Sequence, residues 1–329
     1  MKRIAIELCG LSRTYRDTAY SLLSNVIIPN EEDGWCVDVF IHTWAESDTS
    51  AVVWHNPKGE NRSRKLDSAD AADIIARYRP KAMLIEEPLS IPKEPVLQEQ
   101  LKPFTRSYSS VVSCFHSRAR VNQLREEYSA RTGEHYDYVL MTRLDILFLK
   151  PFRINDFLKT FGQFGLTVPR NTVFTVTAPF KRGLTETERL RCNTDLILFS
   201  DEKTMSRICR FYDELLAGTL TPEYVVKNLY GMEVLWTRYW KDQKIDTALL
   251  SFFEGPDYVI VRPRQAENRQ GAAPAPQTGR AYHLRRNFQS LCDYFRPLFN
   301  WLVDPFAALL YGLKAACIAL RTLILQRLS

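Results

Sequence analysis

The chain has 329 residues, of which 45% are hydrophobic and 12% aromatic, so it can build a packed core, which excludes an intrinsically disordered protein. Its seven cysteines are odd in number and form no Cys-x-x-Cys pair, which argues against a disulfide framework and a zinc ribbon and indicates a reducing compartment. The net charge is +6, but the segment 280–329 alone carries seven basic residues against two acidic ones, so the body is nearly neutral and nucleic acid is not an expected partner.

The first third of the chain alternates strand and helix patterns. The opening apolar stretch, 3–9, is too short for a signal-peptide core and is typical of a buried strand, so we expect a cytoplasmic protein. Helix patterns at 20–26 and 68–78 alternate with further strand patterns at 35–44 and 82–86. This alternation predicts an α/β fold with a mainly parallel sheet, helices on both faces and a ligand crevice at the carboxyl ends of the strands.

Longer elements follow. A long helix is expected over 109–132, and the apolar run 136–152 is predicted to be one strand with two charged residues inside it. Weaker patterns predict a strand at 196–199, helices at 202–217 and 232–241, and a strand at 258–261. We therefore expect one α/β domain over 1–264, a Pro- and Gly-rich linker or mobile loop over 265–279, and a basic tail over 280–329.

Two places in this pattern could carry chemistry. Gly10 and Arg13 follow the first strand, where backbone amides and a guanidinium could meet a phosphate; the alternative is an ordinary turn with a solvated arginine. Arg143 and Asp145 alternate along the predicted strand and would share one of its faces. Asp145 could then hold Mg²⁺ or Mn²⁺, or the two residues could form a buried ion pair that joins two elements.

The order of several sequence blocks carries a resemblance. The blocks RIAIELCGLSRTY, DVFIHTW, QLREEY, YDYVLMTRLDILFLKPF, CNTDLILFS and GMEVLWTRYW occur in this order. Together they resemble bacterial cell-surface polysaccharide glycosyltransferases of the capsule and lipopolysaccharide type, which resemble the GT-A fold. The likeness covers roughly residues 2–263. It implies a GT-A-like catalytic domain that transfers a sugar from a nucleotide-sugar donor to a glycan or lipid-linked acceptor.

The resemblance also implies roles for particular residues. Gly10 and Arg13 would line the nucleotide pocket, and Arg143 with Asp145 would take the place of the acidic metal motif of GT-A enzymes. Because the first acidic position of that motif is an arginine here, the diphosphate could be neutralised without a metal, and the divalent cofactor, Mn²⁺ or Mg²⁺ on Asp145, is left open.

Further candidates surround this pair. Asp195 and Glu233 are the acid/base candidates implied by the resemblance, with a turn residue and a helix N-terminal carboxylate as the respective alternatives. Thr43 and Trp44 lie near a strand end where a nucleobase could bind. His42 is a lone histidine in its segment, and such a residue is more often structural than a ligand.

The tail is rich in apolar and aromatic residues. Its longest uncharged run, 305–313, has nine residues, well short of the roughly 20 that cross a bilayer. As a helix, 293–329 would be amphipathic and basic, which predicts attachment to the inner face of the cytoplasmic membrane. The alternative is packing of this apolar face on the catalytic domain or on a second subunit, so an oligomer stays open.

Two other functional classes compete with the glycosyltransferase. Another nucleotide-using transferase would be expected to carry a phosphate loop such as GxxxxGK, which this sequence lacks. A noncatalytic, membrane-associated scaffold that binds a sugar or nucleotide would tolerate replacement of Asp145.

Overall fold

The computed structural model describes residues 2–48, 63–90, 108–163, 165–177, 193–228 and 232–262. The chain divides into two compact units: Met1–Asn155 with Arg170–Pro263, and Asp156–Pro169 with Arg264–Ser329. In the second unit, the described residues hold most of α6 (Ile154–Gly162). The predicted linker and the predicted amphipathic tail lie outside the described residues. None of the described helices is both long enough and apolar enough to span a bilayer.

The first unit is built on a mostly parallel sheet, as predicted. Its strand order is β3-β2-β1-β4-β7-β6-β8. Strand β7 runs antiparallel to its neighbours β4 and β6, and the other pairings are parallel. The strands are β1 (Arg3–Gly10), β2 (Cys36–Trp44), β3 (Ala82–Glu86), β4 (Tyr138–Arg143), β6 (Thr172–Thr177), β7 (Asn193–Asp201) and β8 (Asp246–Phe253).

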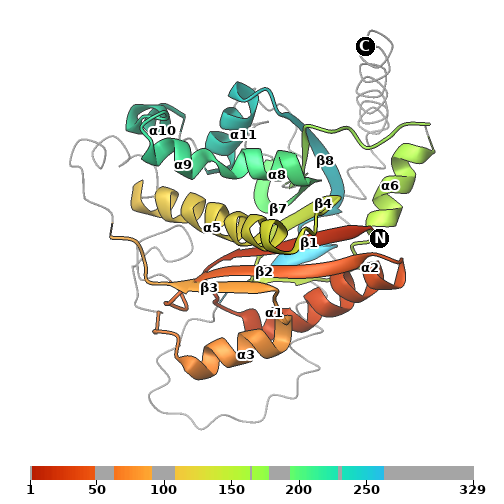
Figure 1. Ribbon diagram of the computed structural model, residues 1–329, viewed down its shortest axis with the longest axis horizontal. Helices are drawn as coiled ribbons and strands as arrows, with labels where there is room; N and C mark the ends of the chain where they lie inside the picture. The colour runs from red at the N-terminus through yellow and green to blue at the C-terminus, as the bar shows by residue number, and fades with distance from the viewer. Residues whose placement is uncertain are drawn as a thin grey trace. The chain divides into compact units, whose positions relative to one another are not determined.

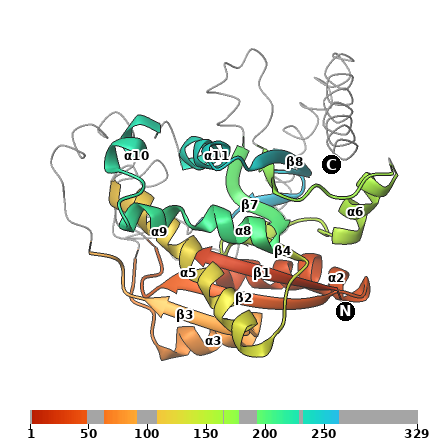
Figure 2. The same cartoon turned by 45° about the horizontal axis from the view of Figure 1, so that its top comes forward.

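Helices cover both faces of this sheet, which confirms the predicted layering (Figure 1). Seen from the turned direction, α5 lies along β1 and β2 with α8 and α9 beside it (Figure 2). One face carries α5 (Tyr108–Thr132), α8 (Glu202–Cys209), α9 (Phe211–Leu216), α10 (Pro222–Asn228) and α11 (Met232–Asp242). The other carries α1 (Tyr15–Leu22), α2 (Ile28–Glu32) and α3 (Ser68–Tyr78). The core beneath α5 is aromatic: Phe115 stacks on Phe211 at 4.0 Å between ring centroids.

Helix α3 has the bounds that its sequence predicts. It begins with a capping box, in which Asp67 Oδ1 accepts from the Asp70 amide and Asp70 Oδ2 accepts from the Asp67 amide, both near 3 Å. It ends at Tyr78, and its C-terminal cap, Arg79, has a φ of 45°, which lies in the left-handed region. Local capping therefore accounts for both ends of this helix.

The helix after β1 changes its winding where a proline interrupts it. A π-helical turn, Leu23–Ile27, joins α1 to α2. Pro29 has no N–H to donate to the carbonyl of Asn25, four residues earlier. That carbonyl accepts instead from the Phe152 amide at 2.7 Å. The carbonyl that the proline leaves without a helical donor thus connects this helix to the segment around Phe152.

The prediction of a single strand over 136–152 is wrong. Strand β4 ends at Arg143, the chain turns, and β5 (Ile146–Phe148) pairs with β9 (Tyr258–Ile260) in a separate two-stranded sheet. Both segments are buried, so the apolar run continues across the turn and hides the change of sheet. Arg143 and Asp145 consequently meet across a turn and do not share one face of a strand.

Candidate functional site

The strand order reverses at the carboxyl ends of β1 and β4. The chain passes from β1 to β2 and β3 on one side, and β4 is added on the other side of β1. Ligands of open α/β sheets bind at such a reversal. Gly10 ends β1 with a φ of 99°, a value that favours glycine, and its amide donates to Ser117 Oγ at 2.7 Å. Arg143 ends β4 beside it.

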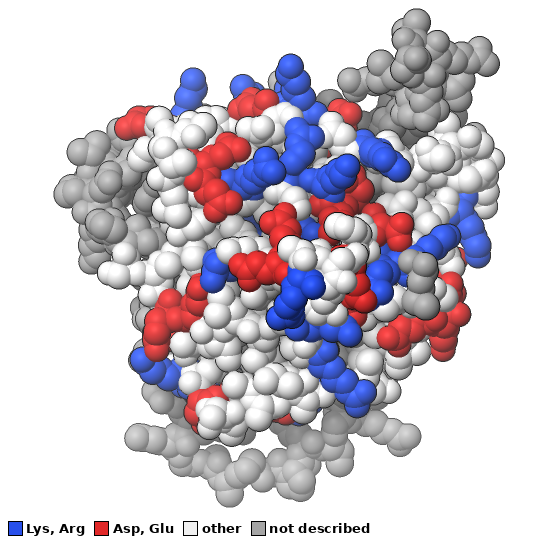
Figure 3. Space-filling model, viewed as in Figure 1, with Lys and Arg blue, Asp and Glu red and all other residues white. Residues whose placement is uncertain are grey.

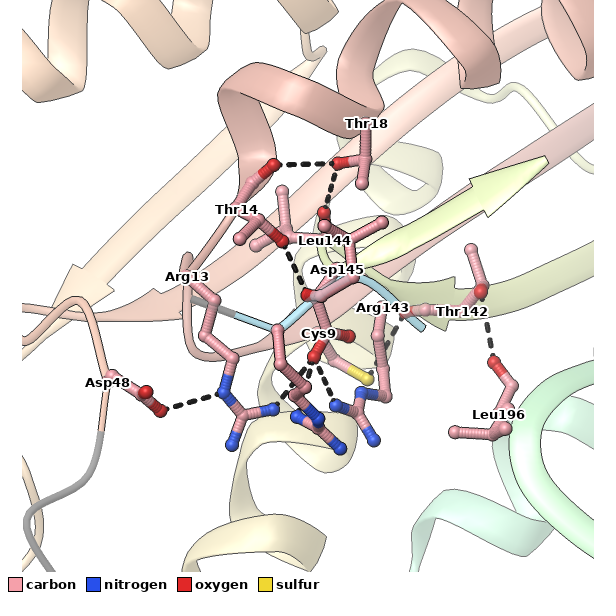
Figure 4. A network of polar contacts seen from close by, with 12 residues as sticks. Cys9, Arg13, Thr14, Thr18, Asp48, Thr142, Arg143, Leu144, Asp145 and Leu196 are labelled. Atoms are coloured by element: carbon pink, nitrogen blue, oxygen red, sulfur yellow. Dashed lines mark hydrogen bonds and ion pairs between the residues drawn. The ribbon is translucent and has the colours of Figure 1, made fainter. Parts of the chain in front are cut away.

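Three guanidiniums converge on one carboxylate at this reversal (Figure 4). Asp145 Oδ2 accepts from Arg13 Nη1 at 2.9 Å, Arg143 Nη2 at 2.5 Å and Arg262 Nη1 at 2.8 Å. Burial raises the pKa of Asp145, but Arg143, Arg13 and Arg262 outweigh burial and lower this pKa to about 2. Asp145 is therefore ionised at neutral pH and serves as the common counter-ion of the three arginines.

Arg13 is held from its backbone as well as from its side chain. Its φ of 40° lies in the left-handed region, which costs a non-glycine residue about 1–2 kcal/mol. Its amide donates to Ser47 O at 2.8 Å, and its Nε donates to Asp48 Oδ1 at 2.9 Å. Residues that follow β2 thus fix the arginine that follows β1.

The small sheet places Asp145 and Arg262. Pairing of β5 with β9 continues in a hydrogen bond from the Val261 amide to Asp145 O at 2.8 Å. Thr14 Oγ1 donates to Val261 O at 2.7 Å, which joins this strand end to the turn after β1. Arg262 therefore joins this network from the far end of the first unit, 117 residues from Asp145 in sequence.

The positive groups of this network are its more exposed part. The side chains of Arg13, Arg143 and Arg262 are 10%, 18% and 23% exposed, whereas that of Asp145 is 1% exposed. Burial lowers the pKa of Arg262, and repulsion by Arg143 and Arg13 lowers it further, to about 9. The three guanidiniums pair with two carboxylates, Asp145 and Asp48, and Arg forks suit the oxygens of a phosphate or diphosphate.

Asp195 borders the arginine network. It lies on β7, and its Oδ2 accepts from Arg118 Nη2 at 2.5 Å. The Arg118 guanidinium in turn lies 4.2 Å from the centroid of the Trp236 ring. Burial lowers the pKa of Arg143, but Asp145 and Asp195 raise it above its ordinary value. Asp195 therefore interacts electrostatically with the arginine network.

The remaining predicted residues have different surroundings. Glu233 is half-buried in the first turn of α11, and Thr237 Oγ1 donates to its backbone carbonyl at 2.7 Å. Thr43 is fully buried, and Trp44 is 5% exposed and stacked on His116 at 5.3 Å. Among the predicted site residues, Arg13 and Arg143 are joined directly to Asp145 by hydrogen bonds.

A second polar cluster lies at the ends of β2 and β3. Glu86 Oε2 lies 3.0 Å from His42 Nε2 and 2.6 Å from His116 Nε2, and the three ligand atoms fall within 4.8 Å of one another. Burial lowers the pKa of His42 to about 4 against the opposing effect of Glu86, so this imidazole is neutral. His42 Nδ1 lies 2.8 Å from Ser117 Oγ, the acceptor of the Gly10 amide.

Sequence reasoning did not identify Arg262, Asp48, Glu86 or His116 as site residues. Arg262 and Asp48 follow strands β9 and β2, respectively. Their position after a strand is the sequence signal that could have identified them as site residues. His116 sits within a helix whose apolar spacing indicates packing.

No protein-family model matches the chain, and the curated proteins include no match either.

Proposed function

We propose that this protein is a glycosyltransferase that moves a sugar from a nucleotide-sugar donor to a glycan or lipid-linked acceptor in cell-surface polysaccharide synthesis. The observation that carries the proposal is the convergence of three guanidiniums on Asp145 where the strand order reverses. A nucleoside diphosphate sugar offers these arginines a diphosphate, and the resemblance of the sequence blocks selects sugar transfer among the reactions of such donors.

In this proposal the arginines bind the donor and stabilise its departure. Arg13, Arg143 and Arg262 contact the diphosphate, whose negative charge grows as the glycosidic bond to the sugar breaks. Asp145 holds the guanidiniums in place before the donor binds, so little reorganisation is needed during the reaction. The attacking acceptor hydroxyl loses its proton to a carboxylate, for which Asp195 and Glu233 are the candidates.

The predicted divalent ion on Asp145 is less well supported by the charges around it. Asp145 Oδ2 already accepts from three guanidiniums, which repel a cation. Asp145 Oδ1 is buried and has no hydrogen-bond partner among the described residues. Charge neutralisation is therefore assigned to the arginines, and no step is routed through Mn²⁺ or Mg²⁺.

The proposal places the enzyme at the inner face of the cytoplasmic membrane. The basic, amphipathic segment 293–329 would hold it there, where a lipid-linked acceptor is accessible. Basic and acidic side chains are interspersed over the described part of the face in Figure 3, in keeping with a nearly neutral body.

The test is binding of UDP-, GDP-, CMP- and dTDP-sugars to the full-length chain, measured by calorimetry and thermal shift with and without Mn²⁺. Arg262→Gln should weaken binding of the preferred donor, because it removes one charge-assisted contact. Arg77→Gln is the matched control, since Arg77 pairs with Asp73 on the surface of α3.

Transfer is then measured, on addition of a membrane lipid extract, as release of the nucleotide leaving group: a nucleoside diphosphate from UDP-, GDP- or dTDP-sugars, and CMP from a CMP-sugar. Absence of binding by all four donor classes to folded protein would refute the proposal. Donor binding that Arg262→Gln leaves unchanged would refute the site.

A further inference from the structure

We propose that His42, Glu86 and His116 form a zinc site, separate from the arginine network and independent of the proposed transferase activity. The three side chains come from the end of β2, the end of β3 and helix α5. Their candidate ligand atoms lie within 4.8 Å of one another. Two imidazoles and one carboxylate are a ligand set that Zn²⁺ takes in sites that keep a fourth, open position.

Two of the three distances between ligand atoms need little adjustment for a metal, and the two imidazole nitrogens lie within 4.8 Å of each other. Ligand atoms of a tetrahedral zinc site are about 3.3 Å apart when the zinc–ligand bonds are about 2.0–2.1 Å. Glu86 Oε2 lies 3.0 Å from His42 Nε2 and 2.6 Å from His116 Nε2. Shifts of a few tenths of an ångström at the Glu86 carboxylate, whose side chain is 26% exposed, would therefore open the space.

Outer partners for two of the ligands are already in place. Metal-binding histidines donate their second ring N–H to a neighbour, which fixes the tautomer. Ser117 Oγ lies 2.8 Å from His42 Nδ1 and can accept that proton while it also accepts the Gly10 amide. Arg120 Nε donates to Glu86 Oε1 at 3.2 Å, which leaves Oε2 for the ion.

The rings are also held in position. His116 stacks on Trp44, with centroids 5.3 Å apart and 25° between planes, and meets the edge of Tyr212 at 4.7 Å. His42 is fully buried within β2. The ligands thus sit on rigid elements, and the partial exposure of Glu86 leaves one side from which water or a substrate oxygen can complete the coordination.

The experiment titrates the metal-free, full-length protein with Zn²⁺ against a chromophoric chelator, and with Co²⁺ for its electronic spectrum. We expect one ion per chain and a tetrahedral Co²⁺ spectrum without thiolate charge-transfer bands. His116→Phe, which keeps a ring between Trp44 and Tyr212, and Glu86→Gln should each weaken binding by about 10–100-fold or more.

His135→Ala is the matched control, because the His135 side chain is 78% exposed, and it should bind as the wild type does. Ser117→Ala, which retains all three ligands, should weaken binding by about 10–100-fold through the loss of the outer partner. Three outcomes would overturn the proposal: no stoichiometric binding by the wild type, thiolate bands in the Co²⁺ spectrum, or unchanged affinity in folded His116→Phe and Glu86→Gln.

Discussion

Replacement of Asp145 by asparagine tests the central ion network. The side chain keeps its shape, but three guanidiniums lose their shared counter-ion. The pKa of Asp145 is lowered from 3.8 to about 2 in the folded protein, and each pKa unit corresponds to about 1.36 kcal/mol. Asp145→Asn should therefore lower the free energy of unfolding at pH 7 by about 2–3 kcal/mol.

The same shift predicts how this difference depends on pH. A carboxylate with a lowered pKa stabilises the fold above its unfolded pKa, and this contribution is lost as pH falls through the folded pKa. The difference between wild type and Asp145→Asn should thus stay constant down to about pH 4 and shrink toward pH 2. Urea denaturation at pH 7, 4 and 3 measures it at low ionic strength.

Asp156→Asn serves as the control, because that side chain is 68% exposed and should change stability by less than about 0.5 kcal/mol. Inorganic pyrophosphate supplies a second readout: it should stabilise Asp145→Asn more than the wild type, since it replaces the missing negative charge. An unfolding free energy for Asp145→Asn equal to that of the wild type at pH 7 would refute the reasoning, as would a difference at pH 3 as large as that at pH 7.

Three further predictions concern other charged groups. Burial raises the pKa of Glu7 from 4.5 to about 7. As pH rises from 4.5 to 7, the free energy of unfolding of the wild type should therefore fall by about 3 kcal/mol relative to that of Glu7→Gln. Parallel pH profiles of the two proteins would contradict this. Because the pKa of Arg262 is about 9, pyrophosphate affinity should fall as pH rises from 8 to 10, and Arg262→Gln should abolish that part of the pH dependence in calorimetric titrations. In the tail, Lys314→Glu combined with Arg321→Glu should weaken sedimentation with phosphatidylserine vesicles at least about tenfold, whereas retention of full binding would indicate that the tail packs on protein.

Local signals predicted much of the scaffold. The bounds of α3 and β3 match the predicted ranges, and α5 differs by one residue at its start, because capping and apolar periodicity act over a few residues. Strands β6 and β8 were not predicted, since their place in the sheet depends on neighbours distant in sequence. The prediction of one helix over 202–217 also differs from the structure, in which α8 and α9 are divided at Arg210.

The site shows the same division. Sequence alone singled out Arg13, Arg143 and Asp145, because charged residues beside buried strands need a compensating partner. It could not show that Arg262 completes their network or that Glu86 joins two histidines. Those contacts form when β9 pairs with β5 and when α5 packs across β2 and β3, and periodicity within one segment carries no information about such long-range packing. Local sequence determined elements such as α3, β3 and α5 and showed which residues are costly to bury, whereas the tertiary structure decided the remaining strands and which of those residues meet.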